Sequence, residues 1–462
     1  MEYRREKDSL GEMKIASGVY WGIHTQRALE NFPLTGQKVN FSLIKAYCLV
    51  KKACAQANRE LKLLDDQKAG AIIQACDEIA EGKFIESFPV DALQGGSGTS
   101  TNMNVNEVLA NRAIEILGGK IGDYTLVNPI QDVNLNQSTN DTYPTALKIA
   151  AIFKFRELSA QIAGLQGVFQ KKEKEFAKVV KIGRTELQEA VPITLGLEFS
   201  AFSEAVARDR WRAFKCEERL RLVNIGGTAV GTGLTAPRSY IFLVIETLRQ
   251  ATGLGLARGE TVLDQTANSD SFVEVSGILK AHASNLIKIS HDLRLLNLLG
   301  EISLAKAQAG SSIMPGKINP VILEVVAQAG MKVIANDLII TQSCSSGSLQ
   351  INEFMPSIAQ ALLESLDVLI NTNRIFAAHA SGIIANPEKC LWYFNRSPAI
   401  VTALLPYIGY DRAQALLDEF RKSAKEDLRL FLEEKLGKQL IDKVFDPYNL
   451  ISLGYKQDEK NS

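Results

Sequence analysis

Five long stretches of the chain repeat apolar residues at three- and four-residue steps, and this periodicity constrains the fold more than any other feature. The stretches lie at about residues 144–180, 195–222, 271–296, 320–341 and 357–376. Apolar residues that recur with the period of an α-helix over such lengths indicate long amphipathic or buried helices. The sequence therefore predicts a mainly α protein built around a bundle of long helices.

The stretch from Val321 to Ile340 is the most apolar of the five. It carries only three charged residues, Glu324, Lys332 and Asp337. In a soluble protein, a helix that is apolar around most of its circumference must be buried on nearly all sides. We therefore expect other helices to enclose it, including helices from other subunits.

Charge and composition exclude several classes of protein. The chain has 52 Lys+Arg against 52 Asp+Glu, so there is no electrostatic case for a dedicated nucleic-acid binder or a polybasic membrane anchor. No uncharged apolar run approaches the ~20 residues that span a bilayer, and residues 1–8 lack the apolar core of a secretory signal. We expect a soluble cytoplasmic protein of several domains, with neither a membrane nor a nucleic acid as partner.

The cysteines and histidines do not predict a metal site. The six cysteines form no C-x-x-C pair, and the four histidines lie far from them in the sequence. This pattern favours free thiols in a reducing compartment over a zinc site or a disulfide framework.

Four polar segments separate the long stretches: residues 94–106, 134–142, 183–188 and 310–319. Each is rich in Gly, Ser, Thr and Asn, and each carries few charges. Turn-forming composition explains part of this, so a plain loop stays open for any one segment. Four such segments together, dense in hydroxyl and amide donors, favour a binding site for a polar ligand.

The segment from Gly310 to Pro320 is the most informative. Asn319 followed by Pro320 predicts a helix start, with Asn319 as the N-cap. In one interpretation the segment is only a glycine-hinged loop that leads into this helix. In the other, the loop closes over an anion, and Lys317, Asn319 and the helix dipole bind a carboxylate. A serine held against backbone N–H groups there would lose its proton and act as a base.

This loop resembles the signature of the aspartase/fumarase superfamily. Gln94–Asn104, Gln137–Asp141 and Gly183–Thr185 resemble the superfamily's substrate-binding segments in the same order. The resemblance runs from Asp8 to Tyr410, nearly the whole chain. Four further features favour the ammonia-lyase branch over class II fumarase: Gly22–Thr25, Gln94–Gly96, Ser138–Asn140, and Asn319–Val321 with Glu324 and Val325.

The resemblance implies a homotetramer with a central bundle of twenty helices, five from each subunit. Each subunit would have three domains: an N-terminal mainly helical domain (1–140), a central five-helix domain (141–385) and a small C-terminal helical domain (386–462). Each active site would combine segments from three chains. We expect no cofactor and no catalytic metal.

The implied reaction is the anti-elimination of ammonia from L-aspartate, which gives fumarate through an aci-carboxylate intermediate. By resemblance, Ser311 is the base that removes the Cβ proton, and Lys317 and Asn319 hold the α-carboxylate. The β-carboxylate, which becomes a dianion, is bound by Thr99, Ser138, Thr139 and Ser312, whereas Asn140 and Thr185 face the leaving amine. Preorganised neutral donors of this kind stabilise developing charge without a metal.

Three positions depart from the superfamily's pattern. Glu186 follows Thr185 where histidine is usual, Asn128 stands where histidine is also usual, and the segment around Asn297 before the signature loop is shortened. Asn128 is interpreted as a turn residue before a proline. Because ammonium leaves as neutral ammonia, loss of a histidine acid at position 186 disfavours a fumarase more than an ammonia-lyase.

The role of Glu186 remains open between three interpretations. Its carboxylate would hold a substrate ammonium group, would point away and pair with a cation, or would share a proton with Glu324. Besides L-aspartate, the open alternatives are a different amino- or N-substituted succinate, the class II fumarase reaction, and a catalytically silent structural homologue.

Overall fold

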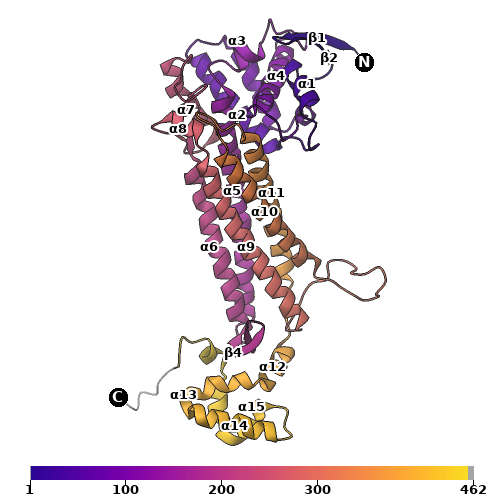
Figure 1. Ribbon diagram of the computed structural model, residues 1–462, viewed down its shortest axis with the longest axis vertical. Helices are drawn as coiled ribbons and strands as arrows, with labels where there is room; N and C mark the ends of the chain where they lie inside the picture. The colour runs from indigo at the N-terminus through magenta and orange to yellow at the C-terminus, as the bar shows by residue number, and fades with distance from the viewer. Residues whose placement is uncertain (1, 456–462) are drawn as a thin grey trace. The chain divides into compact units, whose positions relative to one another are not determined.

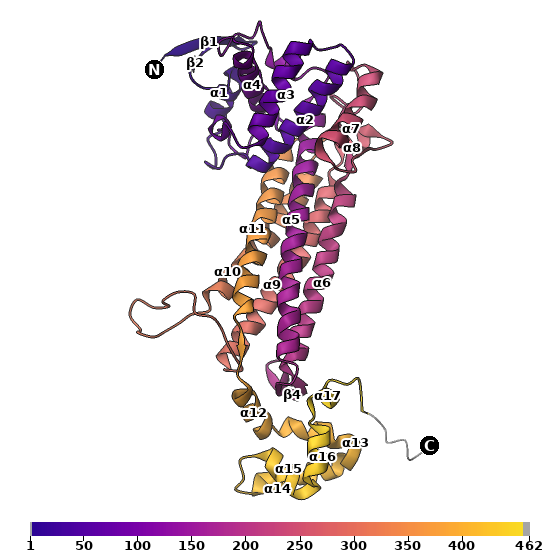
Figure 2. The same ribbon diagram turned by 180° about the vertical axis from the view of Figure 1, so that it is seen from behind.

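The structure is a computed structural model that describes residues 2–455 (Figures 1 and 2). Contacts between residues divide the chain into two units. Unit 1 comprises Met1–Ser159, Arg212–Ala281 and Lys332–Leu369, and unit 2 comprises Ala160–Trp211, His282–Met331 and Ile370–Ser462. The three-domain division inferred from the superfamily stays a prediction.

Five long helices are the main elements of the chain, as the periodicity predicts. They are α5 (Thr139–Glu175), α6 (Leu195–Leu220), α9 (Asp270–Leu298), α10 (Val321–Ser345) and α11 (Met355–Ser381), and Figure 1 shows each as a long coiled ribbon. Each begins or ends within a few residues of the predicted stretch. The mainly α fold with a bundle of long helices is therefore confirmed.

One difference with a structural cause is the start of α5, which begins at Thr139 rather than near Pro144. Proline lacks the N–H that would bond the carbonyl four residues earlier, so the carbonyl of Asn140 is left without its helical partner. The side-chain amide of Asn224 donates to that carbonyl at 2.9 Å. This tertiary contact lets the helix extend N-terminally past the proline.

Portions of the five helices pack together inside each unit. In unit 2, the ring of Phe169 on α5 lies against Phe199 and Phe202 on α6 and Phe376 on α11, with centroid distances of 5.7–6.1 Å. Edge-on aromatic contacts of this kind add to the stabilisation from buried apolar area. This cluster ties three helices of unit 2 into one apolar core.

A buried polar network also joins helices of unit 2. The Nδ1 atom of His282 on α9 lies 3.0 Å from a carboxylate oxygen of Asp209 on α6, and its Nε2 atom contacts the Asn373 side chain on α11. Asn285 donates to the same Asp209 oxygen at 2.8 Å. His282 is thus a structural histidine with partners on both ring nitrogens.

The rest of unit 1 surrounds the starts of several helices. It holds the antiparallel hairpin β1 (Tyr3–Asp8) and β2 (Gly11–Ala16), the helices α1 (Ile23–Asn31), α2 (Phe41–Glu60), α3 (Asp66–Ala80), α4 (Thr99–Ile116), α7 (Arg238–Thr252) and α8 (Val262–Ala267), and a short parallel pair, β5 (Leu222–Val223) and β6 (Ala257–Arg258). Helix α2 packs against α3 and α7.

The rest of unit 2 consists of two small antiparallel pairs and the C-terminal helices. The pairs are β3 (Val180–Thr185) with β4 (Gln188–Thr194), and β7 (Ile302–Ser303) with β8 (Ile384–Ala385). The helices are α12 (Pro387–Arg396), α13 (Leu405–Ile408), α14 (Tyr410–Lys422), α15 (Leu428–Leu436), α16 (Lys438–Val444) and α17 (Pro447–Leu450). Their apolar side chains form one core with Val180 and Ile182 of β3.

Helix α10 exposes the apolar side chains that the sequence led us to expect buried. Val325, Met331, Ile334, Leu338 and Ile339 are each between 37 and 59 % exposed in the single chain. The chain's own helices therefore cover only part of α10, and its enclosure by other subunits stays a prediction. Within residues 2–455, no helix is both long enough and apolar enough to cross a membrane.

Candidate active site

Unit 1 brings four of the predicted site residues to the starts of two helices. Thr99 is the first residue of α4, and Ser138, Thr139 and Asn140 lie at the start of α5. Asn102, in the first turn of α4, donates from its side-chain amide to the hydroxyl of Thr139 at 3.1 Å. Both helix N-termini therefore direct their partial positive charge toward the same polar segment.

A glycine makes the start of α4 possible. Gly98 is the N-cap residue and has a φ of 89°, in the left-handed region that glycine adopts without strain. A Cβ atom at this position would lie 2.1 Å from the ring of Tyr143 on α5. Any side chain here would push the two helix starts apart, so Gly98 is required for the approach of Thr99 to the 138–140 segment.

A buried carboxylate organises the segment before α5. Asp141 accepts hydrogen bonds from the backbone N–H groups of Ser138 at 2.9 Å, Gly226 at 3.1 Å and Thr228 at 2.9 Å. Its side chain is fully buried, and burial raises its pKa to about 7. These bonds hold the predicted β-carboxylate-binding segment against a second loop.

A buried lysine supports the same segment from α2. The Lys51 ammonium group donates to the side-chain oxygens of Asn134 at 3.0 Å and Gln137 at 2.9 Å. Asn134 also accepts from the side-chain amide of Asn102 at 3.2 Å. Burial lowers the pKa of Lys51 to about 8. A connected polar network thus lies behind Ser138 and Thr139.

The second loop is a part of the site that the sequence reasoning missed. Residues 226–235 form a Gly- and Thr-rich loop, and the carbonyl of Ala229 accepts a hydrogen bond from the Asn140 side chain at 2.7 Å. This loop is not among the four polar segments predicted from the sequence. The signal was present, because this loop has the same neutral, donor-rich composition as the four segments already identified.

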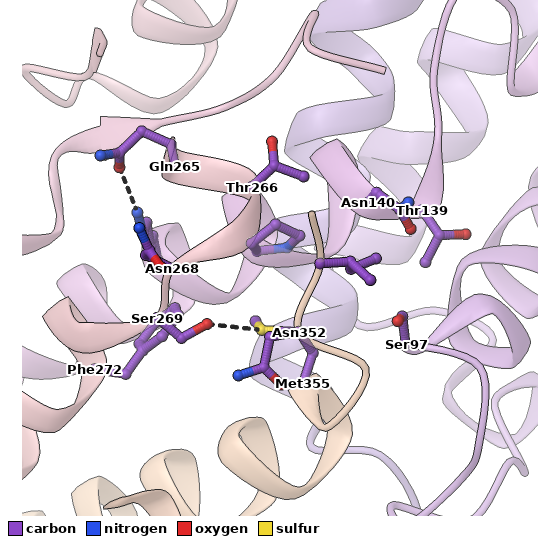
Figure 3. A pocket seen from close by; sticks show the side chains of 13 residues that line it. Ser97, Thr139, Asn140, Gln265, Thr266, Asn268, Ser269, Phe272, Asn352 and Met355 are labelled. Atoms are coloured by element: carbon purple, nitrogen blue, oxygen red, sulfur yellow. Dashed lines mark hydrogen bonds between the residues drawn. The ribbon is translucent and has the colours of Figure 1, made fainter. Parts of the chain in front are cut away.

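A small polar cavity adjoins Thr139 and Asn140 (Figure 3). Its other lining residues are Ser97, Pro144, Lys148, Gln265, Thr266, Asn268, Ser269, Phe272, Ile351, Asn352 and Met355. The space open to the centre of a water-sized sphere is about 10 Å³. That volume accommodates one water molecule but not a four-carbon dicarboxylate. A substrate at Thr139 would therefore bind outside this cavity.

In unit 2, the signature segment forms the long loop between α9 and α10 in Figure 1. The Oγ atom of Ser311 accepts hydrogen bonds from the backbone N–H groups of Ile313 at 3.2 Å and Met314 at 2.9 Å. Ser311 is thus held against two backbone donors, and its role as the base stays a prediction. Two N–H groups aimed at Oγ favour its deprotonated form, because hydrogen bonds to a charged form lower its free energy.

Where this loop meets α10, the contacts of Asn319 differ from the predicted helix cap. Helix α10 begins at Val321, and its first backbone bond runs from Glu324 N–H to the carbonyl of Pro320 at 3.1 Å. The Asn319 side chain instead donates to the carbonyl of Gly310 at 2.8 Å. The prediction of Asn319 as N-cap was therefore wrong by one residue. Its amide closes the neck of the loop, while Ser312 and Lys317 are exposed on it.

Thr185 and Glu186 lie at the tip of the β3–β4 hairpin. Thr185 pairs with Gln188, so Glu186 and Leu187 form a two-residue turn. Both have positive φ, 52° and 62°, which is the geometry of a type I′ turn. Glu186 is exposed, and among the described residues it forms no ion pair. The interpretation that it pairs with a cation of its own chain is not supported.

Comparison with known proteins identifies the family of the chain. The model of a family described as lyase matches residues 11–335. Aspartate ammonia-lyases of Bacillus subtilis (strain 168) and Escherichia coli (strain K12) are 43 % and 41 % identical to it, over 98 % of this chain and 97 % of each relative. The chain belongs to the aspartase/fumarase superfamily. The resemblance inferred from the motifs is confirmed.

Solved structures of this superfamily agree with the fold. Fumarate lyase:delta crystallin from Brucella melitensis, in a structure bound to cobalt, matches with a TM-score of 0.92 at 43 % identity, over 96 % of this chain and 99 % of that one. A class II fumarase from Schistosoma mansoni matches with a TM-score of 0.89 at 31 % identity, over 96 % and 98 %. Among the described residues of this superfamily member, no group of three or more His, Cys, Asp and Glu side chains is placed to hold a metal ion.

Two departures from the superfamily's pattern can be placed in the structure. The Asn128 side chain accepts hydrogen bonds from the backbone N–H groups of Ile130 at 2.8 Å and Gln131 at 2.9 Å, so it caps the short helical turn Pro129–Val133 and acts as the predicted turn residue. Glu324 lies 4.0 Å from Arg294. Within the described part of the chain, no hydrogen bond or ion pair joins Glu324 to Glu186.

The predicted site residues therefore form three groups in this superfamily member. Thr99, Ser138, Thr139 and Asn140 lie together in unit 1, whereas unit 2 carries Thr185 and Glu186 on its hairpin and Ser311, Ser312, Lys317 and Asn319 on its loop. In the described residues of unit 2, no hydrogen bond joins the hairpin tip to the loop. Their assembly into one site stays a prediction.

Proposed function

We propose that the chain is an ammonia-lyase that converts L-aspartate to fumarate and ammonia. Relatives named aspartate ammonia-lyase match it at 41–43 % identity over nearly the whole length of both chains. The structural observation that carries the proposal is the Ser311 hydroxyl, whose Oγ accepts two backbone hydrogen bonds on an exposed loop. An activated serine is what removal of a weakly acidic Cβ proton requires.

The first step transfers the Cβ proton of aspartate to the Ser311 alkoxide. The electron pair of the broken C–H bond moves into the adjacent carboxylate and makes it a dianionic aci-carboxylate. Thr99, Ser138, Thr139 and Ser312 would donate to its oxygens. Preorganised donors that meet charge as it develops are commonly worth a few kcal/mol each.

The second step expels the amine. The electron pair returns to form the Cα–Cβ double bond as the C–N bond breaks on the opposite face, and neutral ammonia leaves. Lys317 and Asn319 would hold the α-carboxylate throughout, while Asn140 and Thr185 face the departing nitrogen. The proton on Ser311 passes to solvent or to ammonia and restores the alkoxide.

The assembly that this mechanism needs is a homotetramer in which three chains contribute to each site, around a bundle of twenty helices. The exposed apolar face of α10 supports such an assembly, because monomeric proteins rarely expose a continuous apolar face of this kind. We also propose a cytoplasmic location, which the six free thiols support.

Glu186 favours a second candidate of the same mechanism. An exposed carboxylate at the hairpin tip, without an ion pair in the described residues, suits recognition of an ammonium or N-substituted group. The second candidate is therefore a lyase for a different amino- or N-substituted succinate. The class II fumarase reaction is disfavoured because departing hydroxide must be protonated, and Glu186 replaces the usual histidine acid at this position. A silent structural homologue would have no need of the Ser311 contacts.

Fumarate absorbs in the ultraviolet, so one assay tests these candidates. Purified protein is mixed with L-aspartate, then with L-malate, and fumarate is followed; the reverse reaction uses fumarate with ammonia. Turnover of L-aspartate and amination of fumarate are expected. Turnover of L-malate instead of these two reactions would favour the class II fumarase reaction. If neither compound reacts, the second candidate or a silent protein replaces the aspartate proposal.

The variant Ser311→Ala tests the base. Loss of general-base catalysis is expected to lower kcat by about 10²–10⁴-fold with little change in thermal stability, since the loop is exposed. Ser345→Ala is the matched control, because that exposed serine hydroxyl donates to the Gln342 carbonyl within α10 and has no other hydrogen bond among residues 2–455. Full activity of Ser311→Ala would remove this residue as the base.

A further inference from the structure

Glu301 is a fully buried carboxylate to which the superfamily resemblance assigned no role. It follows α9, whose C-terminus is closed by Gly300 at a φ of 73°. The Gly300 N–H bonds the carbonyl of Asn297 at 3.1 Å, and the Glu301 N–H bonds that of Leu296 at 3.0 Å. This pair of bonds is a Schellman motif, which fixes the backbone of the residue after the glycine. The shortened segment before the loop therefore ends in a motif that fixes the backbone position of Glu301.

The Glu301 carboxylate contacts two cations of strand β3. Its Oε1 atom accepts from Arg184 Nη1 at 2.7 Å, and its Oε2 atom lies 3.1 Å from the ammonium group of Lys181. Lys181 is also buried and pairs with Glu198 at 2.8 Å. Two anions and two cations therefore balance inside unit 2. Glu198 shares the lysine with Glu301, but of the two carboxylates only Glu301 contacts Arg184 among the described residues.

Arg184 is the residue directly before Thr185 at the hairpin tip. Side chains alternate along a strand, so a side chain that points inward at position 184 directs the next one to the opposite face. The guanidinium of Arg184 also lies over the ring of Tyr393, 5.0 Å from its centroid. The ion pair and this ring contact together fix the direction of the arginine side chain.

The strand at this point has a distorted register that a fixed arginine would stabilise. The pairing of β3 with β4 shifts between Ile182 and Arg184, as in a β-bulge. A Cβ on Gly183 would lie 2.8 Å from the carbonyl of Val191. Bulges re-aim the side chains that follow them and are common beside active sites. Here the side chains that follow are those of Thr185 and Glu186.

The backbone of Glu301 also fixes the start of the signature loop. Its carbonyl accepts from the N–H of Asn386 at 2.8 Å, and the next two residues, Ile302 and Ser303, pair with β8. The loop that carries Ser311 begins directly after this pair. One buried residue therefore anchors both the hairpin and the start of the loop.

We propose that Glu301 is a positioning residue of the lyase reaction: by holding Arg184, it aims the hairpin that presents Thr185 and Glu186 to the leaving amine. The inference rests on the proposed function. Loss of the Glu301 charge leaves the fold of the hairpin but weakens the bond that orients Arg184, so the tip no longer meets the amine in one geometry. Misplacement of a substrate-binding group by about 1 Å lowers rates by on the order of 10²-fold.

The test uses the reverse reaction, because ammonia there binds as a separate substrate. We expect Glu301→Gln to raise the KM for ammonia by on the order of tenfold or more and to lower kcat, with the KM for fumarate changed by less than about twofold. Glutamine keeps the shape and can still accept from Arg184, but it loses the charge-assisted bond. A purely structural role would lower stability without separating the two KM values.

Glu198→Gln is the matched control. It removes the other, part-exposed carboxylate that pairs with Lys181 and leaves the Arg184 contact, so both KM values are expected to stay at those of the wild type. If Glu301→Gln and Glu198→Gln give the same KM for ammonia, charge balance at Lys181 is the only role of Glu301 and the inference is overturned.

A second variant keeps the test decisive should Glu301→Gln fail to fold. Arg184→Lys retains the charge but replaces the planar guanidinium, which is part-exposed, with a point charge. The same rise in the KM for ammonia is expected, and an unchanged value overturns the inference. A wild-type protein that aminates no fumarate would instead fail the proposed function itself, and the inference would fail with it.

Discussion

The backbone of the hairpin tip is strained at a predicted site residue. From this strain we predict how substitutions in the turn change the stability of the protein. Glu186 and Leu187 both adopt left-handed φ values in a turn that favours Asn and Gly. A non-glycine residue in this region costs roughly 1–2 kcal/mol. Such strain is often retained where a side chain is needed for function. Leu187 is 73 % exposed, so its side chain buries little that a substitution would lose.

Leu187→Gly is expected to stabilise the protein. Relief of roughly 1–2 kcal/mol of strain is partly offset by about 0.5–1 kcal/mol of added chain entropy in the unfolded state. The net gain of about 0.5–1 kcal/mol corresponds to a rise of roughly 0.5–1 °C in the thermal midpoint of a chain this long. The assay is calorimetry at one fixed protein concentration, since the stability of an oligomer depends on concentration.

Glu186→Asn separates strain from chemistry at the neighbouring position. Asparagine tolerates the left-handed region, so this variant is also expected to gain stability, whereas its turnover of L-aspartate should fall. Leu187→Gly should keep turnover near that of the wild type. A lower thermal midpoint for Leu187→Gly would refute the strain argument. Unchanged turnover in Glu186→Asn would show that the strained glutamate has no part in the reaction.

Three further predictions test the framework around the site. Asn128→Ala removes a helix cap and should cost about 1 kcal/mol in urea unfolding, while Asn128→Asp should keep most of it; an equal loss in both would contradict the cap. The guanidinium of Arg27 lowers the pKa of Asp8 to about 2, so the stability from this pair is present above about pH 4 and is lost as pH falls toward 2. Asp8→Asn should therefore unfold at nearly the same urea concentration as the wild type at about pH 2 but at a lower one at about pH 5, and a constant difference would exclude the ion pair as its cause. Asp209→Ala leaves the buried His282 without its carboxylate and should cost about 3 kcal/mol, measured as a fall in the denaturant midpoint; a fall below about 1 kcal/mol would show that the network does not stabilise the helices.

The long helices could be predicted from the sequence because their signal is local and repeated. Helix α9, predicted at 271–296, spans Asp270–Leu298, since apolar residues recur over many turns and average out single exceptions. The start of α5 could not be placed in this way. It depends on Asn224, distant in the sequence, which supplies a donor that Pro144 made necessary.

The candidate site was predictable in its segments but not in its supports. Neutral segments dense in hydroxyl and amide groups are uncommon, so residues 138–140 and 310–319 could be recognised by composition alone. Lys51, Asp141 and Glu301 could not, because a single charged residue in a sequence looks the same whether it is buried or solvated. Only the folded chain shows which partners neutralise each of them.

The placement of the polar segments has a physical reason that connects fold and chemistry. Three of the four lie at the start of a helix: residues 94–106 contain the start of α4, residues 134–142 that of α5, and residues 310–319 precede α10. A helix N-terminus offers unpaired N–H groups and partial positive charge, which suits a carboxylate whose charge rises during the reaction. The donors at α4 and α5 are fixed by buried contacts, whereas Ser311, the predicted base, lies on an exposed loop whose ends are joined by the Asn319–Gly310 hydrogen bond. Rigid donors keep their electrostatic effect for the transition state, and the base stays free to approach once substrate is bound. In the proposed mechanism the helices α4, α5 and α10 therefore contribute directly, because the start of each would direct partial positive charge at a segment that binds the substrate.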